Sequence, residues 1–310
     1  MPELPEVETT RQGLLPRLRG NILKNLVVRN PRLRWPVPAD LASHIVGHRL
    51  IGLHRRGKYL LFDFGTATQI VHLGMSGSLR IIASAIFDDA LSKLTEPHNA
   101  ESKPAPTPPS PPRGEGEKAR PKPIYEAAGI HDHIDWEFDG GLILRLRDPR
   151  RFGAVLWSDD PAHHPLLSRL GPEPLTPAFD TQYLYAQCRR RSAAIKQVIM
   201  DSHVVVGVGN IYASESLFHA GIRPGTAAQR LTRPACARLV AAIKRVLESA
   251  IACGGSSLRD YVQSTGELGY FQLQTQVYDR AGLPCKACGT PIRRTVHGAR
   301  AAYFCPHCQR

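Results

Sequence analysis

The spacing of apolar and polar side chains changes from helical to alternating early in the chain. Residues 5–18 place apolar side chains at helical intervals and are followed by Gly20, which predicts an amphipathic first helix. From about residue 21 to residue 157 the period is two, and Gly140-Gly141 offers a tight turn between two alternating runs. Several such strands without intervening helices predict an antiparallel β-sandwich.

The second half of the chain returns to a helical period. Five segments separated by glycines have this spacing: 183–188, 193–201, 210–220, 233–253 and 257–262. They predict a second, mostly helical domain. The last segment, 276–310, is too short to stabilise itself with an apolar core and needs a cross-link or a bound metal ion. We therefore expect an α+β multidomain protein whose domains span residues 1–157, 158–270 and 271–310.

One stretch interrupts the predicted sheet. Between about residues 84 and 130 the alternation is lost, and residues 96–123 are rich in Pro, Glu, Lys and Ser without any apolar period. Such a composition cannot bury enough apolar surface to offset the entropy of ordering the chain. We interpret the stretch as a disordered surface insertion between strands, in which residues 86–94 are a candidate short helix.

The composition of the chain points to a kind of partner. Lys and Arg number 40 against 27 Asp and Glu, which gives a net charge of +13 and a pI near 9.7. A basic surplus of this size favours a polyanion, either nucleic acid or acidic lipid. No apolar run approaches the roughly 20 residues of a membrane-spanning helix, and the acidic N-terminus lacks the pattern of a signal peptide. We therefore expect a cytoplasmic protein without a membrane partner.

Four of the seven cysteines form two C-x-x-C pairs, Cys285 with Cys288 and Cys305 with Cys308, separated by sixteen residues. Two thiolate pairs on tight turns predict a tetrahedral four-cysteine zinc site joined by a β-hairpin. Because protein ligands fill all four positions, we expect one structural Zn²⁺. A redox-active pair is the alternative. The same segment carries six basic side chains against Asp279 as its one acid, which fits binding to phosphates.

The first residues combine a secondary amine with carboxylates. Removal of Met1 would leave Pro2 as the chain start, beside Glu3, and an α-amino group titrates near roughly 7.7–8.0. Such an amine can attack an electrophilic carbon and form an iminium, as catalytic lysines do. The alternative is that this stretch caps the first helix, a role that Glu6 and Glu8 fit in either case.

Two further stretches fit phosphate binding. Residues 205–212 form a Gly-rich turn that enters a helix, where backbone N–H groups can hold an anion. A helix–turn–helix connection that needs glycine is the alternative. Arg189-Arg190-Arg191, followed by Lys196, is either a solvated charge run or a surface that faces DNA.

Two loops carry side chains of the kind that enter a duplex. One loop places Arg150 beside Phe152 at the end of a strand, and another places Met75 between two glycines. Separately each is typical of a turn. Together, an exposed Met, Arg and Phe form the kind of wedge that unstacks a duplex when a nucleotide is flipped out. His131-Asp132-His133 has weak metal-ligand spacing, and we interpret it as a polar strand end.

Several motifs occur in a fixed order along the chain, at residues 2–8, 56–60, 72–77, 148–153 and 207–215, followed by the cysteine hairpin. Together they closely resemble those of bacterial formamidopyrimidine-DNA glycosylases, through nearly the whole chain except the insertion. The resemblance implies an N-terminal β-sandwich, a helix–two-turn–helix domain and a C-terminal zinc finger. It also implies a monomeric, bifunctional DNA glycosylase and abasic-site lyase of the bacterial cytosol and nucleoid. Its substrate would be double-stranded DNA with 8-oxoguanine, formamidopyrimidines or abasic sites, in base excision repair.

The resemblance implies a role for each matching position. Pro2 would attack C1′ of the damaged nucleoside, and Glu3 would assist opening of the sugar. Lys58 matches the proton donor for β-elimination, and Arg300 matches that for δ-elimination. The implied DNA contacts are His131, Arg150, Arg191 and Asn210. The residues implied to fill the space left by the flipped base are Met75, Arg150 and Phe152. A loop at about 257–271 would cover the lesion base.

Three departures from the family pattern stand out. The insertion ends beside His131 and could disturb or extend the DNA contact there. Thr265 stands where the family more often has Asp, which bears on lesion preference. Asp279 stands where Gly is usual, so we expect Asp279 in a turn conformation that Gly tolerates better.

Two other functions are compatible with parts of the pattern. Endonuclease VIII, a sister family for oxidised pyrimidines, shares the Pro-Glu start and the zinc finger. The Leu4-Pro5 pair and the Met-Arg-Phe set favour the purine branch. A zinc-ribbon DNA-binding protein that has lost catalysis would be expected to lack Pro2, Glu3 or Lys58, and all three are present.

Overall fold

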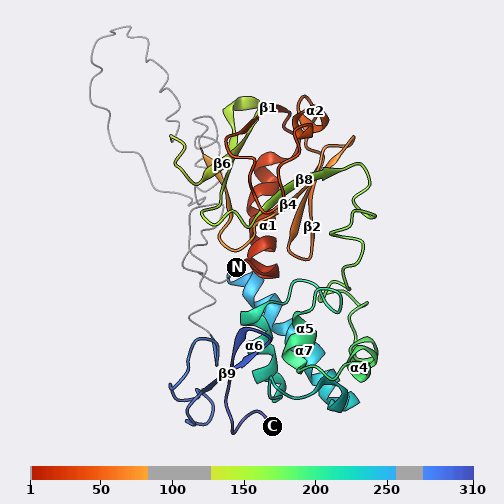
Figure 1. Ribbon diagram of the computed structural model, residues 1–310, viewed down its shortest axis with the longest axis vertical. Helices are drawn as coiled ribbons and strands as arrows, with labels where there is room; N and C mark the ends of the chain where they lie inside the picture. Colours follow the sequence, from red (N-terminus) through yellow and green to blue (C-terminus); the bar gives the residue numbers. More distant parts are fainter. Residues whose placement is uncertain (1, 83–126, 256–274) are drawn as a thin grey trace, which may run out of the picture.

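The structure is a computed structural model that describes residues 2–82, 127–255 and 275–310. Two bodies are stacked along its long axis, a sheet-rich one and a helical one, and a small hairpin lies beside the helices (Figure 1). Most of the expected insertion, the short helix at 86–94, the helix at 257–262 and the loop at 257–271 lie outside the described residues.

The sheet-rich body is the predicted antiparallel sandwich. One sheet has the order β1 (Leu23–Val28), β6 (Asp132–Phe138), β7 (Ile143–Arg147) and β5 (Ser78–Ile82). The other has the order β2 (Gly52–Arg56), β3 (Tyr59–Asp63), β4 (Thr68–His72) and β8 (Ala154–Ser158), and the short helix α2 (Leu41–Ile45) lies outside both sheets. Phe62 and Trp136 stack across the interior with ring centroids 6.5 Å apart. Their packing closes the apolar core that the alternating pattern predicts.

The hairpin between β6 and β7 follows the predicted turn. Gly140 and Gly141 have φ of 69° and 77°, values that L side chains rarely adopt. The turn, named η1 (Asp139–Gly141), closes through a hydrogen bond from Phe138 N to Leu142 O of 2.8 Å. The two glycines therefore fix the register of this pair of strands.

Helix α1 (Leu4–Leu18) connects the two bodies. Its later apolar side chains, Val7, Leu14 and Leu18, belong to the sandwich core. Its first residue, Leu4, belongs to the core of the helical body, and Leu4 N donates to Gly207 O at 3.0 Å. The start of the chain is thereby fixed at the junction of the two domains (Figure 1).

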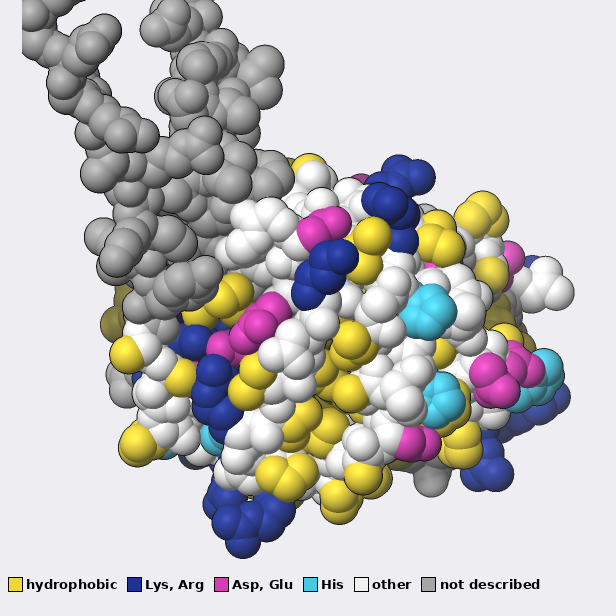
Figure 2. All heavy atoms as spheres, turned by 90° about the horizontal axis from the view of Figure 1, so that it is seen from above, with side chains coloured by type: hydrophobic (Ala, Val, Ile, Leu, Met, Phe, Trp, Pro, Cys, Tyr) yellow, Lys and Arg dark blue, Asp and Glu magenta, His cyan; other side chains and the backbone are white. Residues whose placement is uncertain are grey.

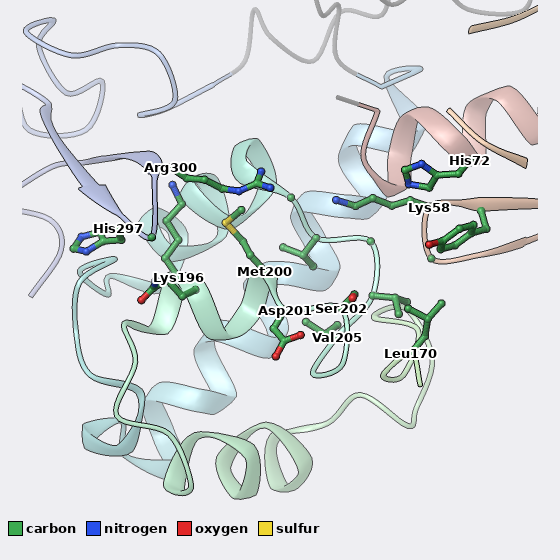
Figure 3. Close-up of a pocket in the computed structure, with 18 of the residues that line it drawn as sticks. Lys58, His72, Leu170, Lys196, Met200, Asp201, Ser202, Val205, His297 and Arg300 are labelled. Carbon is green, nitrogen blue, oxygen red and sulfur yellow. The ribbon is translucent and has the colours of Figure 1, made fainter. Parts of the chain in front are cut away.

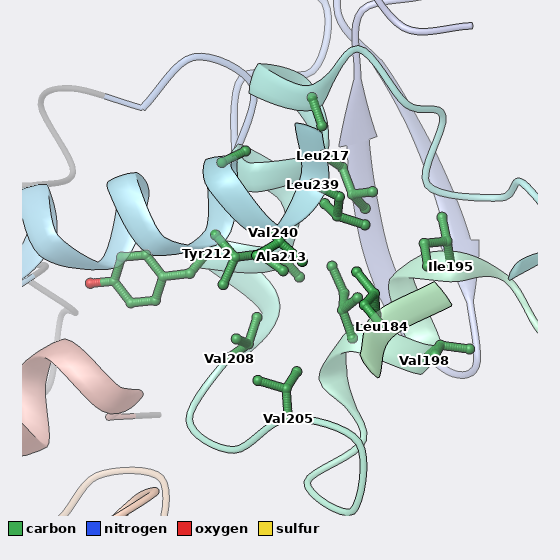
Figure 4. Close-up of a cluster of buried hydrophobic side chains, with 14 of the residues drawn as sticks. Leu184, Ile195, Val198, Val205, Val208, Tyr212, Ala213, Leu217, Leu239 and Val240 are labelled. Carbon is green, nitrogen blue, oxygen red and sulfur yellow. The ribbon is translucent and has the colours of Figure 1, made fainter. Parts of the chain in front are cut away.

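The helical body contains α4 (Thr181–Arg189), α5 (Ile195–Met200), α6 (Asn210–Ala220), the turn η2 (Ala228–Arg230) and α7 (Arg233–Ala252). These helices agree with the predicted segments, and α6 has the predicted bounds. Apolar side chains of all four α-helices meet in one core (Figure 4). Tyr212 extends from this core toward α1 (Figure 4). Gly221, at φ 70°, ends α6 in the left-handed conformation.

The C-terminal hairpin consists of β9 (Arg293–His297) and β10 (Arg300–Phe304), as predicted. It is attached to the end of α6, since Gln309 Nε2 donates to Ile222 O at 2.8 Å. The Glu215 carboxylate of α6 accepts three backbone N–H bonds, from residues 276, 277 and 278, at the start of the finger. Asp279 follows with φ of 57°, which confirms the expected left-handed turn.

Figure 2 looks down on the sandwich end of the molecule. Basic, acidic and apolar side chains are interspersed on this face, without a continuous basic band. The surplus positive charge is therefore not gathered on this visible face. Within the described residues, no helix combines the length and the apolar character needed to cross a bilayer.

Candidate active site

The Pro2-Glu3 pair lies at the start of α1, against the Gly-rich loop that precedes α6. Both residues are buried. Glu3 N donates to Glu6 Oε2 at 2.8 Å, so the capping reading of Glu6 is confirmed. Glu8 instead pairs with Arg11 at 2.7 Å and with Arg55 at 3.0 Å. The expected capping role of Glu8 was wrong, because these two guanidinium groups hold its carboxylate away from the helix end.

The Glu3 carboxylate points at the N-terminus of α6. It accepts hydrogen bonds from Ile211 N at 3.2 Å and Tyr212 N at 3.4 Å, where the helix dipole favours negative charge. Burial nevertheless dominates and raises the pKa of Glu3, while the positive charge of Lys58 opposes the rise. Glu3 therefore keeps its proton to a higher pH than an exposed carboxyl group does.

Glu6 and Tyr212 hold the backbone of Glu3 in place. Tyr212 Oη donates to Glu6 Oε1 at 2.5 Å, while the other oxygen of Glu6 holds Glu3 N. Both side chains are fully buried. The carboxylate thus ties the first turn of α1 to α6. The sequence indicated Glu6 only as a cap, and no local signal pointed to its distant partner.

Lys58 lies on the turn between β2 and β3. Gly57, with φ of 57°, makes the turn possible, and Gly57 N donates to Glu173 Oε1 at 2.6 Å. Glu173 also pairs with Arg55 and Arg56 at 2.8 and 3.2 Å. Burial lowers the pKa of Lys58, and the charge of Arg300 lowers it further, while Glu3 raises it. Lys58 is therefore easier to deprotonate than an exposed lysine.

A cavity of about 450 Å³ lies between the Lys58 turn, α5, the Gly-rich loop and the tip of the C-terminal hairpin. Lys58 and Arg300 point toward one another across it (Figure 3). Arg34 and Lys196 also line the cavity, and Asp201 is the one acid among the described residues of its wall. The cavity therefore suits an anionic ligand such as a phosphate.

Pro2 and Glu3 are not among the described residues that line this cavity. Glu3 lies directly behind Gly209, which does line it. A β-carbon on Gly209 would fall 2.1 Å from Glu3 Cδ, and one on Gly207 would fall 2.5 Å from the Leu4 side chain. The glycines of this turn therefore let the loop lie directly against the start of α1, in addition to any role in connecting two helices.

His72 forms another part of the cavity wall. Burial lowers the pKa of His72 to about 4, and the charges of Lys58 and Arg34 contribute. His72 Nδ1 accepts a hydrogen bond from Gly74 N at 3.0 Å. The ring is therefore neutral at pH 7, with its proton on Nε2.

The structure brings Met75, Arg150 and Phe152 together on two joined loops. Met75 and Phe152 are 37% and 42% exposed, and the Arg150 guanidinium lies 5.0 Å from the centre of the Phe152 ring. Ser76 Oγ donates to Asp148 Oδ1, and Gly153 N donates to Asp148 Oδ2, both at 2.8 Å. One buried carboxylate thus fixes both loops.

The other predicted DNA contacts are spread over both bodies. His131 is half-buried, and its carbonyl accepts from Asp148 N, which places it beside the Arg150 loop. Arg191 follows α4 and folds back onto Gln187. Asn210 is the first residue of α6. In the charge run, Arg189 and Arg190 are exposed.

The four finger cysteines form the one metal-ligand cluster found in the described ranges. Their sulfur atoms all lie within 4.8 Å of one another. The Cys285–Cys308 and Cys288–Cys305 sulfurs are 3.9 and 3.5 Å apart. Zn–S bonds of about 2.3 Å in a tetrahedron require sulfurs about 3.8 Å apart, so the donor set fits one structural zinc ion. The triplet 131–133 is not part of such a cluster.

Three family models match the chain in the order of its domains. The formamidopyrimidine-DNA glycosylase N-terminal domain matches residues 1–155, the H2TH domain of these enzymes matches 170–262, and the zinc finger found in FPG and IleRS matches 282–310. The chain belongs to the formamidopyrimidine-DNA glycosylase family. It is thus a DNA glycosylase and abasic-site lyase for oxidised purines in base excision repair. This result decides against the endonuclease VIII and non-catalytic alternatives.

Full-length relatives agree with this assignment. The formamidopyrimidine-DNA glycosylases of Thiobacillus denitrificans and Thioalkalivibrio sulfidiphilus are 62% and 52% identical, over 100% of this chain and of theirs. The crystal structure of the MutM (Fpg) protein from Thermus thermophilus superposes with a TM-score of 0.78 at 35% identity, over 99% of this chain and 98% of that one. The Lactococcus lactis Fpg in complex with abasic-site DNA has a TM-score of 0.78 at 29% identity, over 99% of both chains.

Proposed function

We propose that this glycosylase attacks its substrate with Pro2, after Met1 has been removed, and that Glu3, Lys58 and Arg300 complete the catalytic set. The Pro2 nitrogen forms a bond to C1′ as the bond from C1′ to the damaged base breaks. The ring oxygen then leaves C1′ as an alcohol, and a covalent iminium remains. Glu3 supplies the proton that opens the sugar, a task that its raised pKa supports.

The iminium makes the neighbouring C2′ proton acidic, so the strand can be cut by elimination. In β-elimination the C2′ proton is lost and the 3′ phosphate departs, with Lys58 as the proton donor. In δ-elimination a C4′ proton is lost and the 5′ phosphate departs, assisted by Arg300. Neither step needs a metal at C1′, and the zinc ion, when bound, supplies only the fold of the finger.

One observation carries this proposal: Glu3 is fixed behind Gly209, and Lys58 and Arg300 face one another across a cationic cavity on the other side. The two groups assigned to successive eliminations thus face the same space. A phosphate of the cleaved strand fits this space by charge. The cavity joins residues from the first and last parts of the chain.

We propose double-stranded DNA with oxidised bases or abasic sites as the partner, bound by a monomer. Solved relatives bound to DNA with an abasic site, with Fapy-dG and with carbocyclic 8-oxo-G support this partner. The base must leave the stack before an amine can reach C1′. In our proposal Met75, Arg150 and Phe152 fill the space it leaves. His131, Arg150, Arg191 and Asn210 would contact the DNA, in the bacterial cytosol and nucleoid.

The proposal is tested with a duplex that carries a single 8-oxoguanine opposite cytosine. Purified enzyme should release the base and cut the strand, leaving phosphates at both ends of the gap. The variant Lys58→Met should release the base but leave the strand largely uncut. Base release and cutting that persist unchanged in Lys58→Met would contradict the assignment of Lys58, and no release of 8-oxoguanine by the wild type would contradict the substrate.

A further inference from the structure

Four exposed arginines form a cluster on the outside of the helical body. The arginine cluster consists of Arg189 and Arg190 at the end of α4, Arg230 in η2 and Arg233 at the start of α7. Arg189 Nη1 donates to Gln229 O, beside η2, at 2.7 Å. The Arg233 guanidinium lies 5.8 Å from the centre of the Tyr185 ring in α4. These two contacts join the three elements, so the four charges share one surface.

The charge of the arginine cluster is unopposed within the described residues. Elsewhere, Arg145 lies 2.7 Å from Asp135, whereas no member of the cluster pairs with a described carboxylate. From residue 181 to residue 247 the sequence holds only two acids, Asp201 in the cavity wall and Glu215 beneath the finger. Arg233 lies in the first turn of α7, where the helix dipole disfavours a cation. Like charges gathered at a cost in stability indicate an anionic partner.

The arginine cluster continues the surface on which Arg191 lies. Gln229 N donates to Arg191 O at 3.0 Å, and Ala228 N donates to Ala193 O at 2.9 Å, so the loop of η2 runs beside the loop after α4. Arg230 directly follows Gln229. In Figure 1, α4 and the C-terminal hairpin lie on opposite sides of the helical body. A duplex held at Arg191 therefore has the cluster beside it, on the side away from the zinc finger.

The chemistry of the cluster favours phosphates over an acidic protein. A guanidinium group binds a phosphate through two parallel hydrogen bonds. A protein partner would need large apolar or aromatic anchors at the centre of its interface. Among the described residues, the exposed large apolar side chains lie outside α4, η2 and α7; they are Ile51, Met75, Ile130, Phe152, Leu283 and Val296.

We propose that the arginine cluster binds the sugar-phosphate backbone of the duplex beyond the segment that holds the lesion. It lengthens the stretch of DNA that the enzyme contacts. Because phosphate contacts carry no sequence information, it strengthens binding to long DNA whether or not a lesion is present. The proposal rests on the DNA contact proposed above for Arg191. The cluster does not line the cavity, so the rate of strand cutting by bound enzyme does not depend on it.

The test measures binding of the full-length enzyme to two duplexes with a central tetrahydrofuran, a stable analogue of an abasic site. The short duplex has about 10 bp, roughly one helical turn, and the long duplex has about 40 bp. Arg230→Gln/Arg233→Gln should weaken binding to the long duplex about tenfold. The slope of log K against log salt should become shallower by about 2, since each phosphate contact contributes about 0.9. Binding to the short duplex should stay within about twofold of the wild type.

Two further variants show whether the charge and its place matter. Arg230→Lys/Arg233→Lys keeps both charges and should keep most of the affinity for the long duplex. Arg19→Gln/Lys24→Gln is the matched control, since it removes two exposed cations from the sandwich, and it should leave the salt slope unchanged. Single-turnover cutting of abasic-site DNA at saturating enzyme should match the wild type in every variant. The circular dichroism spectrum reports whether each variant is folded.

Two results would overturn the inference. A salt slope on the long duplex that is unchanged in Arg230→Gln/Arg233→Gln would leave an acidic protein as the partner of the cluster. An equal loss of affinity for both duplexes would place these arginines at the lesion segment itself.

Arg191→Gln separates this inference from the proposed function. It should weaken binding to both duplexes. If Arg191→Gln binds both duplexes as the wild type does, the contact proposed for Arg191 is wrong. If Arg191→Gln loses affinity while Arg230→Gln/Arg233→Gln keeps it, only the role of the arginine cluster is wrong.

Discussion

Gly209 lies so close to Glu3 that a β-carbon at position 209 would fall 2.1 Å from Cδ of the Glu3 carboxyl group. The two residues are separated by most of the chain, yet the loop and the first helix meet at this point. The contact explains why the turn before α6 carries a glycine at position 209. It also makes the position of the Glu3 carboxyl group sensitive to one methyl group.

The first prediction concerns this contact. Gly209→Ala should displace the Glu3 carboxyl group and lower the rate of base release about 100-fold, because small displacements of catalytic groups cost that much. The measurement is single-turnover release of 8-oxoguanine. Gly129→Ala is the matched control, since a β-carbon there would meet Asp132 at an ordinary 3.5 Å. A Gly209→Ala enzyme with the wild-type rate would refute the claim that this contact positions Glu3.

The second prediction concerns the pH dependence of catalysis. The negative charge of Glu3 raises the pKa of Lys58, against burial and Arg300, which lower it. Glu3→Gln removes that charge, so the pKa of Lys58 should fall further. The alkaline limb of β-elimination on abasic-site DNA should therefore move to lower pH in Glu3→Gln. An alkaline limb that moves to higher pH would contradict the coupling of these two groups.

The third prediction concerns stability in acid. His72 has a pKa of about 4 in the folded protein against 6.5 for the free side chain. The unfolded chain therefore binds the proton first, and stability that is fully present above pH 6.5 is lost as the pH falls toward 4. The shift corresponds to about 3 kcal/mol. In urea titrations, the free energy of unfolding of the wild type should fall by about 3 kcal/mol more than that of His72→Gln between pH 6.5 and pH 4. An equal loss in both proteins would argue against a buried, neutral His72.

The fourth prediction concerns the zinc finger. Chelation of zinc, or Cys305→Ser, should unfold the hairpin, because a segment of this size has little core of its own. DNA affinity should then fall about tenfold, since the basic hairpin is lost. The measurement is a binding titration at fixed salt. Cys253→Ser, at a cysteine outside the cluster, should bind normally. Unchanged binding by Cys305→Ser would count against the structural zinc.

Much of the fold was predictable because its signals are local. Helix α6 begins and ends where the glycines around it indicate, and the hairpin of β6 and β7 turns at Gly140-Gly141. The zinc site of the four cysteines was predictable for the same reason, since the spacing of the ligands can be read directly from the sequence. The amine of Pro2 beside Glu3 was already a candidate nucleophile from the sequence alone, whereas the roles of Lys58 and Arg300 were expected only through the resemblance.

The supporting residues were not predictable because their partners are distant. Glu173 holds the turn of Lys58 from 116 positions away, and Lys196 holds Ala301 from 105 positions away. In the sequence, Lys196 follows a run of arginines that indicates either a solvated face or a surface that faces DNA, whereas the structure buries it. Periodicity reports which face of an element is apolar. It does not report which polar group a distant loop brings to that face.

The most direct test of the account is the site of the covalent bond. Borohydride added during incubation with 8-oxoguanine DNA should reduce the iminium and trap a protein–DNA adduct. After digestion with trypsin, mass spectrometry should find the modification on the peptide of residues 2–11, at the Pro2 nitrogen. A protein that keeps Met1 should form no such adduct. An adduct at Lys58 or Lys196 in the wild-type enzyme, with Pro2 unmodified, would contradict the central claim.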